Sequence, residues 1–232
     1  MANGINTWKQ FDTARENFKN DQKDGRKATL SQKIADAVDT EKSDKTNIIY
    51  MAVEWGYGDA ARNMHGIGEY KTKKKDALEE IADELKTYFK NQKAPKNYDE
   101  FNDKHTKLCE KWTGKFDDQL AFYGKAQKIV NMAFKYLYCC ADADDYSKKE
   151  NDYFKYCHVP LDTFTLEWFR HEWFLRKTRG AGEPTYEMAR LPWSSIKDYD
   201  AYIEFQNCFR EWYENEEITP LQAEFIYWPL VK

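Results

Sequence analysis

The chain has 232 residues, enough for one large helical domain that buries its own core. Charged residues make up 33% of it and aromatic residues 16%, which excludes an intrinsically disordered chain. The formal net charge of −4 counts against a strong binder of nucleic acid over the whole surface, but does not exclude a local basic groove. Basic runs at 71–75 and 176–179 are candidates for such a groove, although solvated helix ends are the preferred interpretation.

The N-terminal part of the chain contains short amphipathic segments followed by a longer helix. Two helices are predicted within residues 1–46, marked by Trp8, Phe11 and Phe18 and by Leu30, Ile34 and Val38. The apolar residues at 47–55 are expected to be buried, and the G-x-G triplets at 56–58 and 66–68 are interpreted as turns. A helix over 74–90 has an apolar residue at every fourth position, the pattern of a surface helix with one buried face.

The middle of the chain is expected to supply the central helix of the fold. A helix opened by Asn97 or Asp99 and closed by Gly114 comes first. The next helix, from about Gln119 to Ala141, is apolar on most sides. Because a helix that is apolar nearly all round must be covered on every side, we expect it in the middle of a bundle.

Three more helices are predicted in the last third of the chain, at 161–176, after Pro192 up to about Asn215, and from Thr219 onward. The last begins with a capping box that has proline at its first helical position. Residues 39–45, 141–150 and 180–184 are interpreted as connections.

The predicted fold class is therefore all-α, an aromatic-rich helical bundle with only 10 glycines and 6 prolines. We expect a single domain over 1–232, with possible sub-lobes at 1–115 and 116–232. No run of apolar residues reaches the length of a membrane span, so no membrane partner is expected.

The five cysteines indicate a reduced, cytoplasmic protein, because their number is odd and the N-terminal residues lack an apolar signal segment. A zinc site would have to use Cys139, Cys140, Cys157 and His158. Neighbouring residues on a helix point about 100° apart, which does not suit adjacent ligands such as the first two. Buried free thiols are the preferred interpretation, and neither a metal nor another cofactor is expected.

Lys128 and Asp162 are the two ionisable residues whose positions suggest chemistry. Lys128 falls in the apolar helix, where burial disfavours a charged amine and so favours a nucleophilic one. Asp162 follows Pro160 and Leu161 at the expected start of a helix, where free backbone N–H groups favour a carboxylate. The structural alternative is a simple N-cap aspartate and a lysine whose amine reaches the surface.

The segments that hold these two residues resemble the helix-hairpin-helix superfamily of DNA glycosylases, and within it the 8-oxoguanine glycosylases, nearest the archaeal type. Gly124-Lys-Ala-Gln-Lys128 takes the place of that family's G-x-G-x-K hairpin. Pro160-Leu-Asp162 takes the place of its Pro-Val-Asp segment. The resemblance covers residues 123–168, and Ala126 stands where the family has its second hairpin glycine.

The resemblance implies a base-excision enzyme with hydrolase and lyase activity, whose partner is DNA that carries a damaged or modified base. Lys128 would attack C1′ of an extruded nucleotide and form a Schiff base, and Asp162 would stabilise the charge that develops on the sugar. The expected substrate-binding residues are Gly124, Gln127, Asn131, His158 and Trp168. Trp55 and Tyr123 are further candidates for stacking on the base.

Two other classes of function stay open. A non-catalytic helical module that binds a protein or a nucleotide-like ligand, for example in phage–host conflict, would suit the acidic surface and the many aromatic residues. An enzyme acting on a small nucleoside would use the same pocket without a DNA groove. Salt-dependent retention on heparin or DNA resin separates the DNA glycosylase from the binding module. The sequence does not determine the base or the oligomeric state.

Overall fold

The computed structural model describes residues 7–20, 29–32, 34, 46–90, 93–140, 153–176 and 187–230. Over these ranges the chain is built from α-helices and short 3₁₀ turns and contains no β-strand, which confirms the predicted all-α class. The connections expected at 39–45, 141–150 and 180–184 lie outside the described residues, as does Val38 of the second short helix.

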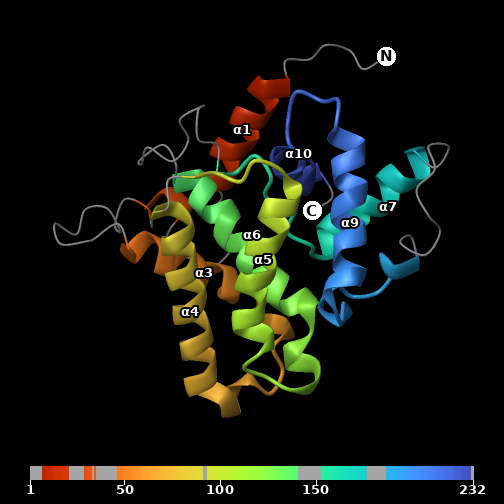
Figure 1. The fold of residues 1–232 in the computed structure, drawn as a ribbon. Helices are drawn as coiled ribbons and strands as arrows, with labels where there is room; N and C mark the ends of the chain where they lie inside the picture. The colour runs from red at the N-terminus through yellow and green to blue at the C-terminus, as the bar shows by residue number, and fades with distance from the viewer. Residues whose placement is uncertain are drawn as a thin grey trace.

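Helix α6 (Tyr123–Cys140) runs through the middle of the bundle (Figure 1). Every residue of it except Tyr138 is buried, as its nearly continuous apolar surface predicted. Helix α3 (Thr46–Ala60) packs along it, and α5 (Tyr98–Thr113) lies against it beside α4 (Lys71–Lys90). The central helix therefore places its polar residues inside the protein, where each needs a partner.

The second half of the bundle consists of α7 (Thr163–Arg176), α9 (Tyr199–Tyr213) and α10 (Pro220–Tyr227). Helix α1 (Thr7–Asn20), from the opposite end of the chain, packs on α10 (Figure 1). Aromatic rings make much of this contact, and the ring centroids of Phe11 and Phe225 lie 5.8 Å apart at a steep angle. The first and last described helices thus contribute to one buried cluster.

Local capping signals set several helix ends. The Asn97 side chain accepts a hydrogen bond from the Glu100 N–H at 2.9 Å and opens α5, and the Asp198 side chain does the same for α9. Thr219 and Gln222 form the predicted capping box of α10. The start of α6 is later than the predicted Gln119, because Asp118–Ala121 forms a separate 3₁₀ turn.

Two glycines of α3 correct the interpretation of 56–58 as a turn, because Gly56 and Gly58 both lie inside the helix. A Cβ atom on Gly56 would overlap the carbonyl oxygen of Ile129, so glycine here lets the backbones of α3 and α6 approach closely. A Cβ atom on Gly58 would meet nothing within 4 Å. The second predicted turn is confirmed at Gly66, whose φ of 83° is in the left-handed region.

This difference predicts opposite effects for two otherwise similar substitutions. Gly56→Ala is expected to lower the free energy of unfolding by about 1–3 kcal/mol, because the added methyl group forces α3 and α6 apart. Gly58→Ala is expected to raise it by about 0.5–1 kcal/mol, since alanine has the higher helix propensity. Denaturant unfolding of both variants measures the two effects, and equal shifts would contradict the close approach at Gly56.

Candidate active site

Lys128 and Asp162 form an ion pair that joins α6 to the start of α7. The Lys128 Nζ donates a hydrogen bond to Oδ2 of Asp162 at 2.8 Å, and the two side chains are only 5% and 15% exposed. The other oxygen of Asp162, Oδ1, accepts from the Thr165 N–H at 2.8 Å and so caps the first turn of α7. The two residues selected from the sequence therefore meet, and Asp162 is both a cap and the partner of an amine.

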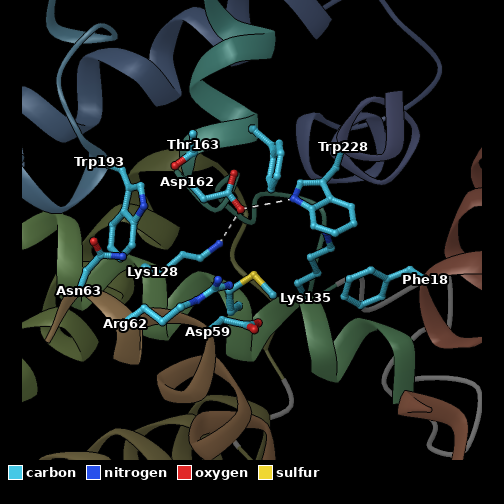
Figure 2. A pocket seen from close by; sticks show the side chains of 12 residues that line it. Phe18, Asp59, Arg62, Asn63, Lys128, Lys135, Asp162, Thr163, Trp193 and Trp228 are labelled. Carbon is cyan, nitrogen blue, oxygen red and sulfur yellow. Dashed lines mark hydrogen bonds and ion pairs between the residues drawn. The ribbon is translucent and has the colours of Figure 1, made fainter. Parts of the chain in front are cut away.

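The pair lies in the wall of a cavity of about 360 Å³ (Figure 2). In Figure 2, Trp193 and Trp228 lie on either side of Lys128 and Asp162. Phe18 and Phe164 add two more rings to the lining. The size and the mixture of rings with a few polar groups are typical of a small-molecule site.

The cavity is assembled from segments that are distant in sequence. Arg62 and Asn63 line it from the 3₁₀ turn Ala61–Asn63 that follows α3. Trp193 begins the 3₁₀ turn Trp193–Ser195, and Trp228 follows α10. No sequence signal marked these four residues, because each is ordinary in its own segment and acquires a role only through the fold.

The carboxyl group of Asp162 is held in its ionised form. Burial by itself would raise its pKa, but the charge and the hydrogen bond of Lys128 outweigh burial and bring the pKa to about 2. The Thr165 N–H and, more weakly, Lys135 act in the same direction. The indole Nε1 of Trp228 also lies 3.4 Å from Oδ2. Asp162 is thus an anion across the physiological pH range.

A second buried ion pair, Lys135 with Glu224, adjoins the first. Both side chains are almost fully buried, and Lys135 lines the same cavity. Burial raises the pKa of Glu224, against the opposing effect of Lys135. The Lys135 Nζ lies 4.4 Å from the ring centroid of Phe18 and 5.4 Å from that of Trp228, within cation–π range. Lys135 stands seven residues after Lys128, the spacing of one helix face, so the sequence itself places the two lysines on the same side of α6.

Gln127 and Asn131 were expected to read a base edge, and the structure places both away from the cavity lining. Both are fully buried. Gln127 binds the backbone of Leu161, and Asn131 donates to the hydroxyl of Tyr202 at 2.8 Å. Their direction follows from the rotation of α6, which turns Lys128 to the cavity and its neighbour Gln127 to the interior.

His158 lies in a buried polar network rather than at the cavity. Its Nδ1 is 2.8 Å from the hydroxyl of Tyr202, and its Nε2 is 2.6 Å from a guanidinium nitrogen of Arg210. The same Nε2 lies 2.9 Å from Oδ1 of Asn102, which also accepts a hydrogen bond from Arg210. Burial lowers the pKa of His158 well below its ordinary value, and burial brings the pKa of the adjacent His105 to about 3. Both rings are therefore neutral.

The remaining aromatic candidates serve the packing of the fold. Trp168 is stacked between Phe209 and Tyr227, with ring centroids 4.8 and 4.9 Å away. Trp55 packs edge-on against a tyrosine of α6, and the hydroxyl of Tyr123 faces His105. None of the three predicted rings is in the cavity lining.

Gly124 has a structural reason to be glycine. Its N–H donates to the carbonyl of Ile196 at 2.9 Å, and the Tyr123 N–H donates to the carbonyl of Lys197 at 3.1 Å. A Cβ atom on Gly124 would overlap the carbonyl oxygen of Trp193. The glycine thus lets the segment that carries Trp193 reach the cavity, and its amide is occupied by protein rather than open to a phosphate.

The cysteines and the basic run at 71–75 agree with their simpler interpretations. All five cysteines are buried free thiols. Within the described part of the chain, no group of histidine, cysteine and acidic side chains is arranged to hold a metal ion. Four of the five residues in the run at 71–75 are exposed at the start of α4, and the run at 176–179 lies almost entirely outside the described residues.

Comparisons with protein-family models, with curated proteins and with solved structures found no match for this chain. The relationship to helix-hairpin-helix glycosylases therefore stays a prediction, which depends on the chain's own residues and on the geometry of the cavity. Among the helices that the structure describes, none is long and apolar enough to cross a membrane.

Proposed function

We propose that this protein is a DNA glycosylase with lyase activity, which removes a damaged or modified base through a Schiff base on Lys128. The observation that supports this most is the hydrogen bond between the Lys128 amine and Asp162 in the wall of an aromatic-lined cavity. Such an enzyme needs a primary amine as nucleophile and an anion that stabilises positive charge on the sugar.

The low pKa of Asp162 indicates which role it takes. A carboxyl group with a pKa of about 2 is a weak base and is not protonated near neutral pH, so it is unsuited to general acid–base catalysis. A permanent anion beside the reacting carbon instead stabilises the oxocarbenium-like charge that develops as the glycosidic bond breaks. Asp162 is therefore assigned an electrostatic role, next to the nucleophile Lys128.

The aromatic lining suits a base that has left the helix. Extrusion costs a few kcal/mol, and stacking on an aromatic ring returns about 1–3 kcal/mol per base. Trp193 and Trp228, on either side of the ion pair, are the best placed rings for this purpose. Arg62, exposed at the cavity, offers a guanidinium group to a phosphate of the same nucleotide.

The chemical sequence follows from these positions. The Lys128 ammonium first gives a proton to solvent water, and the free amine then attacks C1′ while the bond from C1′ to the base breaks. The base departs with the bonding electron pair and takes up a proton. The C1′–O4′ bond then breaks as the proton on the lysine nitrogen passes to O4′, and the opened sugar is the Schiff base. Loss of a C2′ proton to solvent breaks the C3′–O bond and releases the 3′ phosphate.

The direct test is incubation of the protein with borohydride and duplex or single-stranded oligonucleotides that carry 8-oxoguanine, uracil, or alkylated or otherwise modified bases. The expected result is a covalent protein–DNA complex with at least one of these bases, together with strand cleavage when borohydride is omitted. Base release without trapping would contradict the Schiff base. No release from any substrate, with no salt-dependent retention on DNA resin, would overturn the proposal.

A further inference from the structure

Two buried glutamines form hydrogen bonds to the backbone of the segment that leads to Asp162. Gln127 of α6 accepts from the Leu161 N–H at 3.1 Å and donates to the Leu161 carbonyl at 3.0 Å. Gln206 of α9 accepts from the Val159 N–H at 2.9 Å and donates to the Val159 carbonyl at 3.0 Å. Each side-chain amide thus makes the pair of bonds that a neighbouring β-strand would make.

The spacing of these contacts explains why both amides are needed. Val159 and Leu161 are separated by Pro160, which has no N–H to donate. Without the glutamines, two N–H groups and two carbonyls of a buried segment would lose these partners inside the protein. Gln127 and Gln206 are 0% and 2% exposed, so water does not readily replace either amide.

Gln127 lies next to both members of the reactive pair, Lys128 and Asp162. Gln127 and Lys128 are consecutive residues of α6, and the residue that Gln127 holds is the one before Asp162. One helix therefore carries the amine directly and holds the backbone of the acid through the adjacent side chain. Gln206 adds a second point of attachment from α9, two residues further back along the segment.

We propose that Gln127 and Gln206 are positioning residues that set the Asp162 carboxylate against the Lys128 amine, a role that rests on the proposed glycosylase function. Neither side chain lines the cavity, so each acts through Asp162 rather than on the substrate. Catalytic groups must be held to within about 0.5 Å, and a displacement of about 1 Å costs on the order of 10²-fold in rate. Two-point bonds to the backbone on either side of Pro160 provide that restraint.

The test compares Gln127→Met and Gln206→Met with Gln222→Met. Methionine keeps the length of the side chain but makes none of the four backbone bonds. Gln222 is a matched control: the hydrogen bonds of its buried amide go to Tyr138 and to the cap of α10, not to residues 159–161. All three variants therefore lose general stability, whereas only Gln127→Met and Gln206→Met lose the hydrogen bonds to the backbone of Leu161 or Val159.

The first measurement is the titration of the Asp162 carboxyl carbon by NMR between pH 6 and pH 3.5, on folded protein. We expect no titration in the wild type and in Gln222→Met, because the pKa is about 2. In Gln127→Met and Gln206→Met the pKa is expected to rise toward the ordinary value of 3.8, as the carboxylate moves away from Lys128. The second measurement is single-turnover base release, expected to fall about 10²-fold in these two variants with unchanged affinity for DNA.

The outcomes separate this inference from the proposed function. If the wild type releases no base and is not retained on DNA resin, the glycosylase proposal fails, while the titration still decides whether the glutamines position Asp162. Folded Gln127→Met and Gln206→Met proteins with the wild-type titration would overturn the positioning role. Where a methionine variant does not fold, Gln127→Asn or Gln206→Asn replaces it, because the side chain is one methylene shorter and its amide no longer reaches the backbone of Leu161 or Val159.

Discussion

Replacing Lys128 by glutamine is expected to abolish borohydride trapping and to lower the rate of base release by at least about 10⁴-fold. An amide nitrogen does not form a Schiff base, so the glutamine does not take over the covalent step. The Asp162 anion then stays buried without its cation, so the protein is expected to lose about 3–5 kcal/mol of stability, while Asp162 keeps its bond to the Thr165 N–H and its contact with Trp228. Trapping on a gel and single-turnover kinetics measure the effect, and circular dichroism checks the fold.

Lys125→Gln is the matched control for that experiment. Lys125 lies on the same helix, is 5% exposed, and has a pKa lowered by burial, but it does not line the cavity. It therefore shares the burial of Lys128 without its position beside Asp162. We expect Lys125→Gln to trap DNA like the wild type. Trapping that survives in Lys128→Gln and disappears in Lys125→Gln would show that Lys125, and not Lys128, is the nucleophile.

Asp162→Asn is expected to slow base release by about 10²–10³-fold and to destabilise the protein by about 3–5 kcal/mol. Asparagine is as good an N-cap as aspartate, so the first turn of α7 is kept and the change removes only the negative charge. The Lys128 amine then remains buried without its anion, which accounts for the loss of stability. Denaturant unfolding and single-turnover kinetics measure the two effects, and a fully active, equally stable variant would contradict both roles.

The same carboxyl group predicts a pH dependence of stability. Its pKa is about 2 in the folded protein and 3.8 ordinarily, so the fold favours the ionised form. The stabilisation is complete above pH 3.8 and is lost as the pH falls toward 2; it amounts to about 2 kcal/mol. As the pH is lowered from 6 to 3, the free energy of unfolding is expected to fall less for Asp162→Asn than for the wild type. Identical slopes would show that Asp162 is not paired in solution.

The candidate site was accessible to sequence reasoning only in part. Lys128 stood out because it interrupts an apolar helix, and Asp162 because it precedes a helix after a proline; both are local signals. Lys135 carried the same signal as Lys128 at the spacing of one helix face, and its partner Glu224 could not be recognised because α10 is far away in sequence. Gln206 is one polar residue in the polar pattern of α9, and nothing near it indicates that it binds Val159.

The directions in which the side chains of α6 point differ most from the sequence-based prediction. Gln127 and Asn131 flank the reactive lysine in sequence, which suggested contact with a base, yet both hold the chain from inside the protein. On a helix, consecutive residues point about 100° apart, so neighbours of a catalytic residue face other directions. The interpretation of Gly56 as part of a turn was wrong for a related reason, since a glycine that lets a neighbouring helix approach has the same sequence signature as one in a turn.

Helical periodicity, capping residues and the near-continuous apolar surface of α6 follow from interactions within a few residues, and for that reason the printed sequence was enough to predict an all-α bundle and its central helix. The cavity depends on side chains from α1, α6, α7 and the segments at Arg62, Trp193 and Trp228. Long-range packing brings these side chains together, because the rotation of each helix about its axis determines which residues face inward. Only the folded protein decides that Lys128 faces Asp162 while Gln127 holds the backbone beside it.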